Sequence, residues 1–166
     1  MLIKDILNEL GNRPLAMPNK WSSDYDEYYK NISLPDGKNL RIAFNLSYNN
    51  YALLNFYVDQ SQQMTGTGDA ILILSTVVDQ LRDFVRKRRP NVIAWTANDN
   101  DLSRIRVYDK MMPRIIQLPE FKNYLDITND ESMWPDDLTG TLDDFQDVSS
   151  GKLYVLGKKS FIRMIK

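Results

Sequence analysis

One order of elements in the middle of the chain constrains the fold more than any other feature. The apolar run YALLNFYVD, residues 51–59, leads into the loop QQMTGTGDA, residues 62–70. Residues 69–88 then place apolar side chains at three- and four-residue steps, which predicts a helix that Pro90 ends. NVIAWTA, residues 91–97, is typical of a buried strand. A strand, a helix and a strand in this order predict a βαβ unit with two parallel strands.

The residues before this unit change to the period of strands. The runs YYKNISL and NLRIAFNLSY flank Pro35-Asp36-Gly37, which predicts a hairpin, and Asn49-Asn50 predicts a second turn. KLYVLG, residues 152–157, is typical of a final strand. We therefore expect an α/β (α+β) fold with a twisted mixed sheet, mostly antiparallel, one parallel pair, and helices on both faces.

Composition excludes several kinds of chemistry. The 166 residues are expected to form a single domain, residues 1–166, and they include no Cys and no His. Thiol nucleophiles, disulfides and histidine-based triads are therefore excluded, and no metal site is expected. The net charge of -1 gives no general electrostatic reason to bind nucleic acid. Without an apolar run of roughly 20 residues, we expect no membrane span and a cytoplasmic location.

The loop before the long helix has the chemistry of an anion site. Gln63, Thr65, Gly66, Thr67 and Gly68 stand just before the helix start. The first amides of a helix lack intrahelical acceptors and carry partial positive charge, and glycines let a phosphate approach the backbone. Two glycines in an ordinary connection are the alternative interpretation.

A second helix is expected after the strand at residues 91–97. Asp101 is a candidate N-cap for a helix that runs to Met112, and Tyr108 shares one side of it with Ile105. Asn98 and Asn100 precede the cap and are typical of turns.

An acidic segment lies at residues 126–150. It contains eight Asp or Glu residues between Asp126 and Asp147 without an intervening Lys or Arg. This pattern predicts a solvated insertion, or a surface for a basic protein partner.

A basic segment ends the long helix, with Arg82, Arg86, Lys87, Arg88 and Arg89. A phosphate contact is one interpretation of these side chains. A solvated helix end is the other.

The order of these elements resembles the GNAT superfamily of acyl-CoA-dependent N-acetyltransferases. The resemblance rests on the strand at residues 51–59, the Q-x-x-G-x-G pattern from Gln63 to Gly68, the helix and strand that follow, and Tyr108 in SRIRVYDKM. The tract from residue 66 to residue 111 also resembles small GNAT-like proteins of tailed bacteriophages, which would place the chain in the host cytoplasm.

The resemblance implies roles for particular residues. Gly66, Thr67 and Gly68, with Gln63 and Thr65, would bind the pyrophosphate of acetyl-CoA. Tyr108 would be the acid that protonates the departing thiolate, although a core position is the alternative. Asp59 would be the acidic candidate for the base, although it is also typical of a turn.

The resemblance implies further residues around the cofactor and the acceptor. Asn98 and Asn100 would orient the cofactor or the helix that carries Tyr108. The aromatic residues Trp21, Tyr25, Tyr28 and Tyr29 would help to build the acceptor site, or would pack locally.

Two classes of function follow from this resemblance. The first is transfer of an acetyl group from acetyl-CoA to an amine of a small molecule or protein. The second is a catalytically silent GNAT-like module that binds a host or virion protein, or a structural phage component. The sequence leaves the acceptor, the general base and the oligomeric state open.

Overall fold

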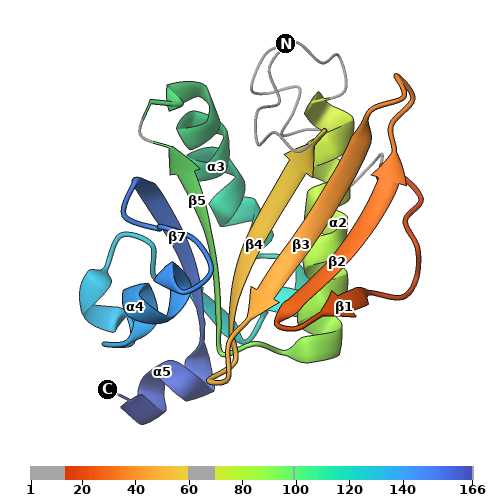
Figure 1. Cartoon of the computed structure of the whole chain (residues 1–166). Coiled ribbons are helices and arrows are strands. Elements are labelled where there is room, and N and C mark those ends of the chain that lie inside the picture. The colour runs from red at the N-terminus through yellow and green to blue at the C-terminus, as the bar shows by residue number, and fades with distance from the viewer. Residues whose placement is uncertain (1–13, 60–69, 99, 166) are drawn as a thin grey trace. The chain divides into compact units, whose positions relative to one another are not determined.

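The computed structural model describes residues 14–59, 70–98 and 100–165 (Figure 1). The chain divides into two compact units. The first comprises Met1–Phe44 and Leu54–Lys87, and the second comprises Asn45–Leu53 and Arg88–Lys166.

The described helices and strands alternate along the chain. In sequence order they are β1 (Ser22–Asp24), β2 (Glu27–Ser33), β3 (Asn39–Leu46), β4 (Tyr51–Val58), α2 (Ala70–Arg88), β5 (Val92–Asn98), α3 (Leu102–Ile115), η1 (Pro119–Phe121), β6 (Tyr124–Asp126), η2 (Glu131–Met133), α4 (Leu138–Asp143), β7 (Gly151–Lys158) and α5 (Lys159–Ile165).

Seven strands form the sheet in the order β1-β2-β3-β4-β5-β7-β6. The sheet is mostly antiparallel, and β4 and β5 form the one parallel pair, as the sequence predicts. The last strand in sequence, β7, pairs with β5 from Val92–Gly157 to Asn98–Gly151 and with β6 on its other edge. The predicted fold class is confirmed.

In the first unit, α2 packs through its apolar side on the strands. Phe84 of α2 stacks on Phe44 of β3 at 4.0 Å between ring centroids, and Trp21 meets both rings edge-on. The hairpin turn holds Gly37 at φ 86, a left-handed conformation that glycine adopts without steric cost. Both predicted elements, the long helix and the first hairpin, are therefore present.

In the second unit, alternate residues of β5 and β7 face different helices, and α3 and α4 lie on opposite sides of these strands (Figure 1). Val92, Ala94, Leu153 and Val155 belong to a buried cluster that includes side chains of α4 and α5. Tyr154, between Leu153 and Val155, hydrogen-bonds to α3 instead. The period-2 alternation of strand side chains accounts for this division.

The end of the acidic segment meets the sheet at Gly151. A Cβ atom added at Gly151 would lie 2.1 Å from the carbonyl oxygen of Ala97 on β5. Only glycine fits this close approach of two backbones.

The acidic segment itself differs from the prediction of a solvated insertion. Its eight carboxylate residues are exposed, as expected, but Ile127, Leu138, Leu142 and Val148 are at most 4% exposed. They cover the outer side of β5 and β7, so the segment contributes to the core of the second unit. Apolar residues spaced between the charges therefore decide its structure.

Candidate functional site

The cofactor-binding residues of the expected loop lie outside the described residues. Gln63, Thr65, Gly66, Thr67 and Gly68 are all in this part of the chain. The described helix α2 begins at Ala70, two residues after Gly68. The amides that the sequence predicts as anion donors, those of Gly66, Thr67 and Gly68, precede this helix in the chain.

The two strands of the expected βαβ unit pair in parallel over three positions. These pairs are Tyr51–Val92, Ala52–Ile93 and Leu53–Ala94, and all three lie in the second unit. The remainder of β4, from Leu54 onward, belongs to the first unit.

Tyr108 lies on α3 and is 4% exposed. Its ring meets the ring of Tyr154 edge-on at 5.5 Å between centroids. Burial raises the pKa of Tyr108 to about 12, so the hydroxyl stays protonated at neutral pH. This buried, packed position is the one expected of a core residue, and the acid role of Tyr108 stays a prediction.

Tyr154 is a polar residue that sequence reasoning missed. Its hydroxyl donates to a carboxylate oxygen of Asp109 at 2.8 Å and also lies 3.2 Å from the carbonyl oxygen of Ile105. Lys152 donates to the same Asp109 oxygen at 2.7 Å. Burial, and then the bond to Asp109, raise the pKa of Tyr154 above its usual range. In the sequence, the available signal for Tyr154 is an aromatic residue within the predicted strand KLYVLG. In the structure, this residue pairs with Trp95 of β5.

The Tyr154 ring also fixes the neighbouring rings. It stacks on Trp95 with an interplanar angle of 9° and a centroid distance of 5.9 Å. Tyr108, Tyr154 and Trp95 therefore form a continuous aromatic layer between α3 and the strands.

Asn98 and Asn100 are brought together in the turn before α3. The side-chain oxygen of Asn98 accepts from the amide of Asn100 at 2.9 Å, and its carbonyl accepts from the amide of Asp101. Asp101 caps α3 by accepting from the amide of Arg104 at 3.0 Å, as predicted. The oxygen of the Asn98 side chain is thus engaged in the turn, as expected of a turn residue.

Asp59 lies in the first unit, at the end of β4. Its carboxylate accepts from the amide of Asn39 at 2.8 Å, and its own amide donates to the carbonyl of Asn39. Its φ of 50 is in the left-handed region. These contacts join the ends of β3 and β4 that lie away from the turn at residues 47–50, so Asp59 has a structural role.

A buried ionic cluster joins β2 to α2 in the first unit. The ammonium of Lys30 donates to Gln80 at 2.7 Å, lies 3.4 Å from the carboxylate of Asp83, and is 4.6 Å from the centroid of the Trp21 ring. Burial lowers the pKa of Lys30, although Asp83 opposes this effect. Trp21, from the predicted aromatic cluster, also donates its indole N–H to Asp83 at 2.9 Å. This aromatic residue is therefore packed locally.

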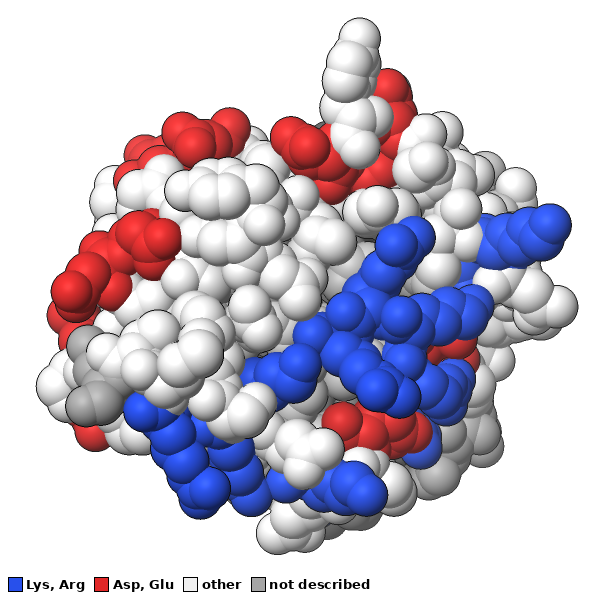
Figure 2. Space-filling view, turned by 90° about the horizontal axis from the view of Figure 1, so that it is seen from below, with Lys and Arg blue, Asp and Glu red and all other residues white. Residues whose placement is uncertain are grey.

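The predicted basic segment at the end of α2 is partly neutralised. Arg86 and Lys87 bind Asp83 at 3.2 and 3.0 Å. Figure 2 shows Lys and Arg side chains gathered on the face seen from below, with Asp and Glu side chains among them. The mixture of charges favours a solvated helix end.

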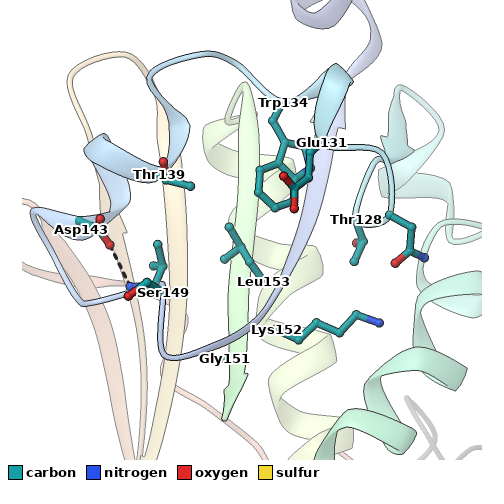
Figure 3. Close-up of a pocket in the computed structure, with 11 residues that line it drawn as sticks. Thr128, Glu131, Trp134, Thr139, Asp143, Ser149, Gly151, Lys152 and Leu153 are labelled. Carbon is teal, nitrogen blue, oxygen red and sulfur yellow. Dashed lines mark hydrogen bonds between the residues drawn. The ribbon is translucent and has the colours of Figure 1, made fainter. Parts of the chain in front are cut away.

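A cavity of about 660 Å³ opens beside the acidic segment in the second unit. Its lining includes Thr128, Glu131, Trp134, Asp143, Lys152 and Leu153 (Figure 3). We call it the insertion cavity. In the described part of the chain, no group of three or more Asp or Glu residues is arranged to hold a metal, and no helix is long and apolar enough to cross a bilayer.

The comparison with known proteins finds matches among solved structures. No family profile and no curated protein matches the sequence. The chain is similar to a chimera of the spermidine N-acetyltransferase SpeG from Vibrio cholerae and hSSAT, with 9% identity, a TM-score of 0.43, and coverage of 84% of this chain and 72% of that chain. A point mutant of Vibrio cholerae SpeG matches with 9% identity and a TM-score of 0.41, over 84% of this chain and 69% of that chain. Both of these proteins are variants of a spermidine N-acetyltransferase.

Proposed function

We propose that the chain transfers an acetyl group from acetyl-CoA to an amine. The supporting observation is the order β4, glycine-containing loop, α2, β5 and α3, in which β5 runs parallel to β4 and α3 carries Tyr108. This order is the one that the sequence resemblance requires.

The pyrophosphate would bind at the start of α2. Gly66, Thr67 and Gly68 would offer backbone amides there, and Gln63 and Thr65 would add side-chain donors. The helix dipole favours an anion at this end, and the 19-residue length of α2 sustains that dipole. In the second unit, Asn98 and Asn100 would orient the helix that carries Tyr108.

Bound acetyl-CoA supplies an activated acetyl thioester. In the transfer, a bond forms between the acceptor nitrogen and the acetyl carbon, the bond from carbon to sulfur breaks, and the electron pair leaves with sulfur. Tyr108 would donate its phenolic proton to that sulfur, and the acceptor nitrogen would lose a proton to a base, for which Asp59 is the acidic candidate. The products would be a neutral amide and the CoA thiol, and proton exchange with water would restore both side chains. A pKa of about 12 keeps Tyr108 in the donor form throughout the neutral range.

Binding of CoA tests the proposal. Calorimetry on the full chain is expected to show saturable binding of CoA, which Gly66→Glu abolishes by adding a side chain and a negative charge to the loop. Gly140→Glu is the matched control, because a Cβ atom at Gly140 meets no atom within 4 Å. Absence of CoA binding to the unmodified chain would refute the proposal.

Turnover tests the role of Tyr108 separately. Tyr108→Phe is expected to lower acetylation of a panel of amines by about 10²-fold while CoA affinity is kept. An unchanged rate would exclude Tyr108 as the acid.

A second candidate function is binding of a basic protein partner through the acidic segment. It is favoured by the exposure of all eight of its carboxylate residues. This binding would fall with added salt and with combined replacement of Asp130, Asp136 and Asp147 by Asn. Binding that survives both changes would exclude it.

A further inference from the structure

The insertion cavity has the size and construction of a small-molecule site. Its volume of about 660 Å³ falls within the range of about 300–1,000 Å³ that ligand pockets occupy. Leu153 and Val148 are buried and form an apolar part of its lining. All of its lining residues belong to the second unit, so the cavity is complete within that unit.

An indole ring is held in place in the lining of this cavity. Trp134 donates its indole N–H to the carbonyl oxygen of Ile127 at 2.7 Å and packs against the buried cluster of the second unit. The side chain is nevertheless only half-buried. Figure 3 shows Trp134 between Thr139, Asp143 and Ser149 on one side and Thr128 and Lys152 on the other. A fixed, partly exposed indole offers an aromatic face to a ligand.

The charge of the cavity is negative. Glu131 lines the cavity together with Trp134 (Figure 3), and no Lys or Arg among the described residues forms an ion pair with it. One carboxylate oxygen of Asp143 accepts from the amide of Val148 at 2.9 Å, which fixes its orientation. The basic residue of the lining, Lys152, is paired with Asp109 of α3 at 2.7 Å. Within the described residues, Glu131 and Asp143 therefore have no Lys or Arg as an ion-pair partner.

We propose that the insertion cavity binds a small organic cation, an alkyl ammonium ion whose carbon chain covers Leu153 and Trp134 and whose charge is neutralised by Glu131 and Asp143. An ammonium ion gains from the indole face as well as from the carboxylates, whereas an anion would be repelled by both. The hydroxyls of Thr139 and Ser149 supply further acceptors for the N–H groups. This binding is independent of the proposed acetyl transfer, because it requires no CoA.

Calorimetry with matched probes in the absence of CoA tests this site. Hexanediamine and hexylamine are expected to bind in a saturable manner, at least about tenfold more tightly than hexanediol, which has a similar length and no charge. Adipate is expected not to bind. Equal binding of hexanediamine and hexanediol, or no binding of hexanediamine, would overturn the proposal.

Two neighbouring aspartates provide a matched pair of variants. Asp143→Asn removes a charge from the cavity and is expected to weaken hexanediamine at least about threefold, as is Glu131→Gln. Asp144→Asn removes the same charge from an exposed residue that does not line the cavity, and is expected to leave affinity unchanged. If Asp144→Asn weakens binding as much as Asp143→Asn, the attraction is non-specific and the site is wrong. Thermal unfolding of each variant verifies that it is folded.

Discussion

The two units hold their central helices by different chemistry. In the first unit, α2 is tied to β2 by a charged cluster of Lys30, Gln80 and Asp83. In the second unit, α3 is tied to β7 by the neutral hydroxyl of Tyr154, beside the ring of Tyr108. A carboxylate with a lowered pKa is vulnerable to acid, and tyrosines with raised pKa values are vulnerable to alkali. The comparison predicts that opposite extremes of pH weaken different units.

The largest effect is expected from Asp83→Ala. This change leaves the ammonium of Lys30, whose side chain is 3% exposed, without its carboxylate partner. Removing one partner of a buried ion pair lowers the free energy of unfolding by about 3–5 kcal/mol. Urea unfolding followed by tryptophan fluorescence measures the loss, and the double change Lys30→Met with Asp83→Leu is expected to recover most of it. A loss below about 1 kcal/mol would mean that water screens the pair.

Alkali is expected to weaken the second unit through Tyr108. Its pKa is raised from 10.0 to about 12, so between these values the unfolded state loses a proton that the folded state keeps. The stabilisation is complete below pH 10 and is lost as pH rises through about 12, by roughly 3 kcal/mol. Urea unfolding across this range measures the slope, and Tyr108→Phe serves as the control with a smaller slope. Equal slopes for the two proteins would contradict the assignment.

Acid is expected to weaken the first unit through Asp83. Partial burial opposes ionisation, but hydrogen bonds from Lys87 and Trp21 outweigh it and lower the pKa of Asp83 from 3.8 to about 2. Stability is therefore complete above the unfolded value and falls as pH drops through about 2, by roughly 2 kcal/mol. Unfolding curves of the original chain and Asp83→Asn between these values measure the difference. A steeper dependence in the variant would show that another group dominates.

The smallest effect is expected from Tyr154→Phe. The change keeps the ring against Trp95 and Tyr108 and removes the hydroxyl that binds Asp109 and Ile105. One hydrogen bond of this kind contributes about 1 kcal/mol to the free energy of unfolding. Tyr25→Phe, at a residue that is 97% exposed, is the control and is expected to change nothing. If the two variants match in urea unfolding, α3 is held by ring packing alone.

Local periodicity predicted those elements that depend on neighbours in sequence. The helix expected at residues 69–88 is α2, Ala70–Arg88, because its apolar side and the proline after it act locally. The N-cap role of Asp101 was predictable for the same reason. The prediction that α3 ends at Met112 was short, since the helix continues through Pro113 to Ile115.

Contacts between residues far apart in sequence could not be predicted. Lys30 and Gln80 are 50 residues apart, and the sequence around either residue does not indicate that the two side chains form a hydrogen bond. In the acidic segment, the many carboxylates predicted a solvated insertion, but Leu138 and Leu142 share one side of α4 and are buried. Burial depends on the surface of β5 and β7 that these leucines cover, which one-dimensional spacing does not describe.

Of the candidate site, the sequence could indicate residue types but not their surroundings. The raised pKa of Tyr108 arises from its burial beside Tyr154, a residue of a distant strand. The hydrogen bond that binds Asp59 to Asn39 was likewise visible only in the folded chain.

Gly151 sets a limit on how this protein can diversify. A chain that leaves the sheet after β6 has to return to β7 through a residue without a side chain, because the carbonyl oxygen of Ala97 occupies the place of a Cβ atom. Replacement of the stretch between Asp126 and Gly151 is therefore expected to be tolerated only where the new stretch still covers β5 and β7 and keeps this glycine.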